Sequence, residues 1–98
     1  MDAEVHTPPE QLDIDDGVRV EIVIWKVPRS LKGSMHRFKY RLALIVDDAC
    51  VLRFDNEAGK GDHMHIGARE FEYDFRDPDQ LTVDFWTEVE KWMRDHRR

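Results

Sequence analysis

The sequence predicts an α+β domain, in which an antiparallel sheet of about four strands carries one C-terminal helix packed across it. Several segments alternate apolar and polar residues with the period of two that is typical of a strand with one buried face. The last segment alone repeats its apolar residues at helical spacing. The length of 98 residues suits a single domain, and the chain has no internal repeats.

Residues 1–16 are predicted to be a flexible acidic tail, so that the domain proper spans residues 17–98. This segment contains Pro8 and Pro9, lacks apolar periodicity and carries no Lys or Arg. Its acidic residues account for the whole net charge of −6, and the rest of the chain is neutral. An acidic protein binds nucleic acid poorly. Nucleic-acid binding therefore depends on where the cations of the domain gather.

Three strands are predicted before a glycine-rich loop. The first, Val18–Val27, is rich in β-branched residues and ends at Pro28. The second, His36–Val46, alternates clearly, and the third is Cys50–Asn56. The polar face of the second strand carries a row of cations: Arg37, Lys39 and Arg41.

The hydrophobic pattern also predicts how the second and third strands pair. A two-residue turn would set Leu42 opposite Arg53 on one face. A three-residue loop, Asp47-Asp48-Ala49, matches apolar with apolar residues and is preferred. The pairs that it predicts are Leu42 with Phe54, Leu44 with Leu52, Arg41 with Asp55, and Lys39 with Glu57.

Residues 70–75 alternate again and predict a fourth strand, and the helix follows it. Asp77 suits the N-cap, Pro78 the first helical position and Gln80 the capping-box position. The apolar face expected to pack on the sheet recurs at helical spacing. Its members are Leu81, Phe85, Val89, Trp92, Met93 and His96.

Composition bounds the setting in which the protein works. The single cysteine, Cys50, excludes an internal disulfide, and its apolar neighbours predict a buried, unreactive thiol. There is no signal peptide, and no apolar run approaches the ~20 residues of a membrane span. We expect a soluble cytoplasmic protein without a membrane association, and an exposed sheet edge is compatible with a homodimer.

Residues 54–67 concentrate the groups that carry out chemistry. If residues 63–66 are extended, His63 and His65 emerge on the same face, because side chains alternate along a strand. Lys60 lies between two glycines, whose backbone N–H groups can turn toward an anion while Lys60 adds a positive charge. The GxxxxGK[ST] spacing of a P-loop is not present.

Three interpretations of this segment follow. In the first, His63, His65 and either Asp62 or Asp55 bind a divalent metal ion, although two imidazoles without a convincing third ligand give a weak signal. In the second, the histidines and Lys60 act on a phosphodiester, one imidazole taking a proton while the other gives one. In the third, the segment is a glycine-rich turn with surface histidines and ordinary cross-strand charge pairs. Pattern alone favours the third.

Four stretches, taken together, resemble the TumE-like family. They are Phe38-Lys39-Tyr40-Arg41-Leu42, the run RFDNEAGKGDHMHIG from Arg53 to Gly67, Glu70 with Tyr73, and Asp84-Phe85-Trp86. The likeness covers residues 18–93, nearly the whole predicted domain. Met64 is a departure, since a basic residue is expected between the two histidines, and its absence removes a phosphate contact.

The resemblance implies a toxin component of a bacterial toxin–antitoxin pair, with a helix-turn-helix antitoxin as its partner. Joined to the second interpretation, it gives a leading hypothesis of metal-independent RNA cleavage that needs no cofactor. His63 and His65 are expected to be the acid–base pair, with Asp62 or Asp55 orienting a histidine. Lys60 and Arg41 would neutralise the phosphate, and Arg37 and Lys39 would hold the RNA backbone. Asp55 and Asn56 would contact the substrate.

Two alternatives stand beside this hypothesis. One is a non-enzymatic protein-binding module that is neutralised by the antitoxin, for which Trp25, Trp86 and the sheet edge would matter more than the histidines. The other is a metal-dependent hydrolase that uses the HxH motif.

Overall fold

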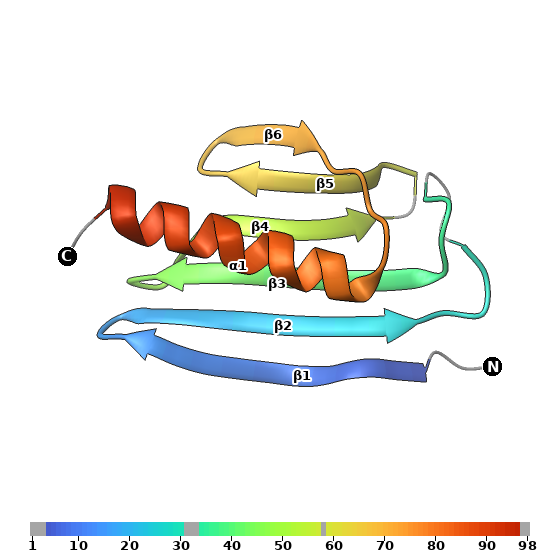
Figure 1. The fold of residues 1–98 in the computed structure, drawn as a ribbon, viewed down its shortest axis with the longest axis horizontal. Coiled ribbons are helices and arrows are strands. Elements are labelled where there is room, and N and C mark those ends of the chain that lie inside the picture. The colour runs from blue at the N-terminus through green and yellow to red at the C-terminus, as the bar shows by residue number, and fades with distance from the viewer. Residues whose placement is uncertain (1–3, 31–33, 58, 97–98) are drawn as a thin grey trace.

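A computed structural model describes residues 4–30, 34–57 and 59–96. Within these ranges the chain forms one six-stranded antiparallel sheet, whose strands follow one another in chain order from β1 to β6 (Figure 1). The elements are β1 (Glu4–Asp15), β2 (Val18–Lys26), β3 (Phe38–Val46), β4 (Ala49–Glu57), β5 (Gly61–Ile66), β6 (Arg69–Glu72) and α1 (Pro78–Asp95).

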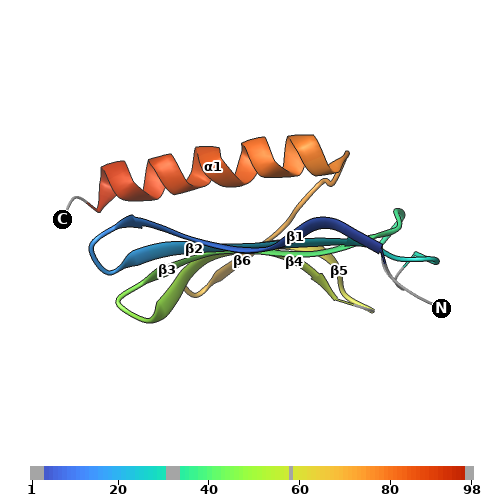
Figure 2. The ribbon, with the colours of Figure 1, turned by 90° about the horizontal axis from the view of Figure 1, so that it is seen from below.

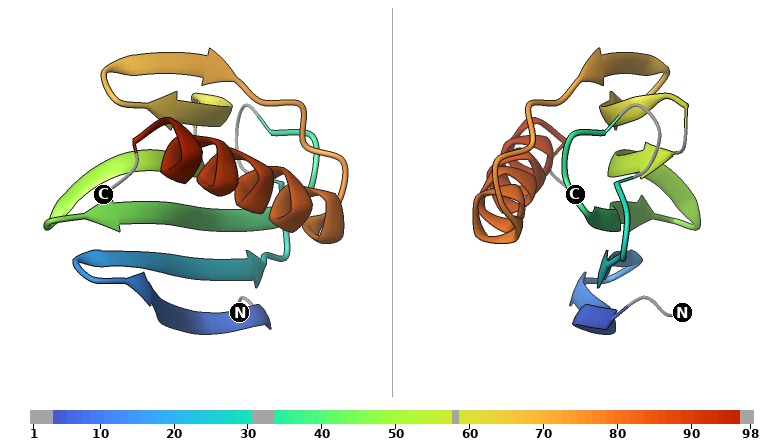
Figure 3. Two further views of the ribbon diagram at one scale, coloured as in Figure 1. Left: turned by 60° about the vertical axis from the view of Figure 1, so that its left-hand side comes forward. Right: turned by 90° about the vertical axis from the view of Figure 1, so that its right-hand side faces the viewer.

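The molecule has two layers. Seen edge-on, α1 lies along one face of the twisted sheet, and no described element covers the other face (Figure 2). We call these the helix face and the open face. β1 and β6 form the two outer edges (Figure 3). The α+β layout with one C-terminal helix is therefore confirmed.

The core lies between α1 and the helix face. Alternate residues of the central strands are buried there because the strand period of two sends every second side chain toward the helix. Burying each such side chain fully contributes roughly 1.5–3 kcal/mol. The buried cluster is Val18, Val20, Ile22, Ile24, Tyr40, Leu42, Leu44, Val46, Leu52, Phe54, Leu81, Phe85 and Val89.

The helix start is confirmed. Asp77 is the N-cap and its carboxylate accepts a hydrogen bond of 2.7 Å from the backbone N–H of Gln80, with Pro78 as the first helical residue. The C-terminal end differs from the prediction, because His96 is exposed instead of packed on the sheet. It caps the helix, and its ring stacks on Trp92 with centroids 4.1 Å apart.

The prediction of about four strands is wrong, since the sheet has six. One added strand is β1, which lies in the segment predicted to be a flexible tail and pairs with β2, so the sheet begins at Glu4 instead of near residue 17. Its register shifts between Thr7 and Glu10, around the two prolines. Acidic residues and prolines are tolerated at a sheet edge, where one side needs no partner. The other added strand is β5, which contains the HxH motif.

The predicted register of the second and third strands is correct, but the predicted loop is wrong. The pairs Leu42–Phe54, Leu44–Leu52 and Arg41–Asp55 are all present, whereas the predicted pair Lys39–Glu57 lies beyond Arg41–Asp55, the last pair of the ladder. The turn itself has two residues, Asp47 and Asp48, whose φ values of 49° and 67° fit a type I′ hairpin turn. A bulge takes up the extra residue between Leu44 and Ile45 on one side and Cys50 and Leu52 on the other.

This bulge also explains why Cys50 is exposed instead of buried. Cys50 pairs with Ile45, a residue whose side chain points to the open face, next to the exposed turn. Its thiol donates a long hydrogen bond of 3.5 Å to the carbonyl of Leu52.

Candidate active site

The two histidines of the HxH motif lie together on the open face. Met64 and Ile66 of β5 pack against the core, so His63 and His65, which alternate with them along the strand, point away from the helix. The ring centroids of His63 and His65 are 6.4 Å apart, and the side chains are 20% and 27% exposed. Two partly exposed imidazoles therefore lie next to each other on the open face of the sheet.

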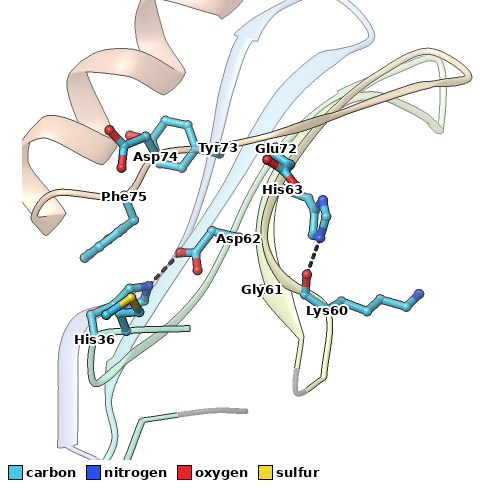
Figure 4. A pocket seen from close by; sticks show the side chains of 10 residues that line it. His36, Lys60, Gly61, Asp62, His63, Glu72, Tyr73, Asp74 and Phe75 are labelled. Atoms are coloured by element: carbon cyan, nitrogen blue, oxygen red, sulfur yellow. Dashed lines mark hydrogen bonds and ion pairs between the residues drawn. The ribbon is translucent and has the colours of Figure 1, made fainter. Parts of the chain in front are cut away.

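Each histidine has a carboxylate beside it. His65 Nε2 lies 3.6 Å from Asp55 Oδ1 on β4, and His63 Nδ1 lies 3.8 Å from Glu70 Oε1 on β6. His63 Nε2 donates a hydrogen bond of 2.5 Å to the carbonyl of Lys60 (Figure 4). His63 Nδ1 is buried and has no hydrogen bond within the described residues. His63 must therefore rotate away from the Lys60 carbonyl before either nitrogen can reach a substrate.

Arg53 is a cation of this site that the sequence analysis missed. It lies opposite His65 in the β4–β5 register, and its side chain is 33% exposed. Arg53 Nε is 2.9 Å from Asp55 Oδ2, but the N–H does not point at that oxygen well enough for a hydrogen bond, so the contact is an ion pair. The β4–β5 register is the signal that would have identified this residue.

Arg41 lies in the same cross-strand row as Asp55 and His63, two strands from the latter. Its guanidinium does not bind Asp55 but donates to Glu21 on β2, at 3.1 Å. Partial burial opposes the charged form of Glu21, but hydrogen bonds from Arg19, Arg41 and Gln11 outweigh it and hold the pKa of Glu21 below its ordinary value.

The remaining predicted cations are spread around this face. Lys39 is opposite Trp25 in the β2–β3 register, and Arg37 precedes β3, where its carbonyl accepts from the N–H of Val27 at 2.8 Å. Lys60 is 69% exposed and lies 3.7 Å from Glu57. Cations and carboxylates thus alternate across the open face instead of forming a uniformly basic track.

Asp62 lies on the helix face, away from His63 and His65. Its carboxylate accepts three short hydrogen bonds, from Ser34 Oγ at 2.6 Å, Tyr40 Oη at 2.7 Å and His36 Nε2 at 2.6 Å. His36 Nδ1 accepts from the N–H of Phe38 at 3.1 Å, so the proton of the neutral ring is on Nε2. The histidine that Asp62 orients is therefore His36, which the sequence analysis did not select.

Asn56 is only 1% exposed, and this corrects its predicted role in substrate contact. Its Oδ1 accepts from the N–H of Tyr40 at 3.0 Å, and its Nδ2 donates to the carbonyl of Phe38 at 2.7 Å. The side chain thus continues the β3–β4 ladder beyond its last backbone pair, Arg41 with Asp55. Asn56 stabilises the sheet beneath the site.

The chain matches the family model described as Toxin TumE over residues 1–93, which takes in all six strands and nearly all of α1. It belongs to the TumE toxin family. The match includes β1, in agreement with the place of that strand in the sheet. Searches of curated proteins and of solved structures gave no match.

The TumE family chain has a cavity of about 280 Å³ beside the histidines. It lies where the chains of β5 and β6 separate, just beyond the 3.0 Å hydrogen bond from the N–H of Tyr73 to the carbonyl of Asp62 (Figure 4). Side chains from both faces of the sheet reach it. Those that matter for its chemistry are His36, Lys60, Asp62, His63, Glu72 and Phe75.

Two further observations concern metals and membranes. Among residues 4–30, 34–57 and 59–96, no three His, Cys, Asp or Glu side chains are grouped as ligands of one metal ion. No helix in that part of the chain is long and apolar enough to span a membrane.

Proposed function

We propose that this TumE family toxin acts on RNA by metal-independent phosphodiester cleavage, with His63 and His65 as the acid–base pair. One observation carries the proposal: the two imidazoles lie side by side on the open face, each with a carboxylate behind it. Imidazole is the side chain best suited to exchange protons near neutral pH, and a neighbouring carboxylate orients it.

In the proposed reaction one imidazole removes the proton of a ribose 2′-hydroxyl, and the 2′-oxygen attacks the adjacent phosphorus. The bond from phosphorus to the 5′-oxygen breaks, and the other imidazole protonates that oxygen. The products are a 2′,3′-cyclic phosphate and a 5′-hydroxyl, so atoms and charges balance. The ring centroids are 6.4 Å apart at rest, and the reaction requires His63 to leave the Lys60 carbonyl, so that each imidazole can approach the phosphodiester to the hydrogen-bond distance of about 2.7–3.2 Å.

Cations around the pair would stabilise the negative charge that develops on the phosphate. Arg53 lies directly opposite His65. Lys60 approaches from the loop before β5. Arg41 is two strands from His63, about 10 Å at ordinary strand spacing. Arg41, Lys39 on β3 and Arg37 just before β3 therefore suit neighbouring phosphates of the RNA backbone.

We further propose that the toxin is neutralised by an antitoxin protein of the helix-turn-helix class, as membership of a toxin family suggests. A non-enzymatic toxin that binds a protein target is the second candidate. It is favoured by the resting geometry, in which His63 bonds to a backbone carbonyl and Arg41 and Arg53 are paired with carboxylates.

RNA cleavage by the purified toxin, freed of its partner and in the presence of EDTA, tests the first candidate. His63→Ala and His65→Ala should each lower the rate by about 10²-fold or more, because each removes one proton-transfer group. His96→Ala is the matched control, since this exposed histidine caps the far end of α1, and it should cleave like the parent.

Failure of every form to cleave, or cleavage by the two variants at the rate of the parent, would remove the catalytic claim. Cleavage only after zinc or manganese is added would support a metal-dependent hydrolase instead. Growth arrest by the double variant, equal to that by the parent, would favour the protein-binding toxin.

A further inference from the structure

We infer that the cavity between β5 and residues 72–75 is a base-binding subsite that selects guanine. This inference deepens the proposed function, because it rests on RNA being the substrate. It assigns a role to His36, Glu72 and Phe75, which the proposed proton transfers do not use.

The position of the cavity connects it to the acid–base pair. Lys60 and His63 belong to its lining. A nucleotide whose phosphate lies against these two side chains would therefore have its base next to the cavity. The volume of about 280 Å³ is close to the lower end, roughly 300 Å³, of pockets that hold small molecules, which suits one base better than a larger ligand.

One wall of the cavity is aromatic and held in place. The rings of His36 and Phe75 stack with centroids 3.8 Å apart. His36 is fixed by its bonds to Asp62 and to the backbone of Phe38, so this wall is formed before any ligand arrives. Aromatic side chains are the surfaces on which single-stranded RNA bases stack.

The acceptor on the opposite side is Glu72. It lies across the β5–β6 ladder from His63 and beside it at the cavity (Figure 4). It is exposed, whereas both oxygens of Asp62 already accept hydrogen bonds from Ser34, His36 and Tyr40. Among the carboxylates that line the cavity, Glu72 is thus the one that lies beside His63 and can take a base.

A carboxylate has two acceptor oxygens and no donor, so it discriminates among the four bases. Guanine presents two neighbouring donors, the ring N1–H and the 2-amino group, which match both oxygens at once. Adenine and cytosine present an amino group next to an acceptor nitrogen. Uracil presents one N–H between two carbonyl oxygens, and these oxygens would be repelled by the negatively charged carboxylate.

Charge also sets the direction in which a nucleotide would enter. Asp74 lines the side of the cavity nearest α1, whereas Lys60 and His63, with Glu72 beside His63, line the other side (Figure 4). Asp74 disfavours a phosphate deep in the cavity, and Lys60 attracts it to the side of the proposed reaction. We therefore expect the base to enter the cavity and the phosphate to remain beside His63.

Titration of the toxin with the four nucleoside 5′-monophosphates, followed by NMR shifts of the His36 and Gly61 signals, tests this subsite directly. None of the four contains an RNA phosphodiester, so the parent protein can be used. We expect guanosine monophosphate to bind at least tenfold more tightly than uridine monophosphate. Glu72→Gln should abolish that preference, and Phe75→Leu should weaken the binding of all four nucleotides.

Glu90→Gln is the matched control, because this glutamate is exposed on α1 and away from the cavity. It should leave nucleotide binding unchanged. Circular dichroism of each variant reports whether it is folded, and Glu72, being exposed, is not needed for the core. Equal binding of all four nucleotides, no binding of any, or a guanine preference that survives Glu72→Gln would overturn the inference.

Cleavage assays separate this inference from the proposed function. If the toxin cleaves RNA with no preference at guanosine, and Glu72→Gln changes nothing, the subsite is wrong and the acid–base pair stands. If the toxin cuts no RNA but binds guanosine monophosphate through Glu72, the subsite stands and the proposed chemistry is wrong.

Discussion

Asp62 and His63 are neighbours in sequence but serve opposite faces of the sheet. Because side chains alternate along β5, Asp62 points to the helix face and His63 to the open face. Asp62 binds His36, Tyr40 and Ser34, and so joins the chain before β3 to the start of β5. The residue next to the proposed acid–base pair is therefore a structural anchor.

Replacing Asp62 by Asn should destabilise the protein by about 2–3 kcal/mol, because a side chain that is only 10% exposed and accepts three hydrogen bonds loses its charge and one of its oxygens. Urea unfolding measures the difference. Asp48→Asn is the matched control, since Asp48 is 95% exposed and Asn tolerates its positive φ. If Asp62→Asn lowers the free energy of unfolding no more than Asp48→Asn does, the three hydrogen bonds to Asp62 contribute little to stability.

At the scale of elements, local pattern was sufficient where one face of a strand is buried. It predicts β2, β3, β4 and the N-cap of α1, and it finds the register of β3 with β4 from apolar matching alone. It misses β1, because an acidic strand that contains two prolines resembles a tail unless its partner is known. It also misplaces the turn, since a bulge changes the loop length without changing the register.

The same reasoning explains which parts of the site were predictable. That His63 and His65 share a face follows from the strand period alone. The roles of Asp62 and Asn56 depend on Ser34, His36 and Phe38, which come from another part of the chain. Arg53 was missed because its proximity to His65 depends on the β4–β5 register. Contacts across the sheet are not visible in local pattern.

The β3–β4 turn should be sensitive to residues that resist positive φ. Asp48 has a φ of 67°, a conformation that is costly for β-branched side chains. Asp48→Val should destabilise the protein by about 1–2 kcal/mol, whereas Asp48→Gly should be neutral or stabilising because Gly suits this position of a type I′ turn. Thermal unfolding of the two variants compares them. Equal stability of the two would argue against the type I′ turn.

Strand β1 makes a prediction that separates an edge strand from a flexible tail. Backbone amides of β1 that bond to β2, such as those near Gln11 and Leu12, should exchange with solvent far more slowly than amides of an unstructured segment. Hydrogen–deuterium exchange of the full chain measures this. Exchange at the rate of an unfolded peptide throughout residues 4–15 would instead support the prediction that this segment is a flexible tail.

At the scale of the whole molecule, the hydroxyl groups of two tyrosines hold separate elements together. Tyr40 on β3 donates to Asp62, and Tyr73 donates to Asp84 of α1 at 2.6 Å. Asp84 also accepts from Gln80, so the segment before the helix and the first turns of α1 are held to one carboxylate. Both hydroxyls therefore act as donors that the folded protein needs.

Alkaline pH should unfold the toxin through these two residues, which are the two tyrosines of the chain. Burial, followed by the hydrogen bonds to Asp62 and Asp84, raises both pKa values well above the ordinary 10.0. The folded state therefore holds protons that the unfolded state releases, so stability is complete below pH 10 and falls as the pH rises above it. Tyrosinate absorbance should appear together with the loss of circular dichroism, and Tyr73→Phe should halve the absorbance change. Reversible ionisation of both tyrosines near pH 10 with the fold intact would contradict these contacts.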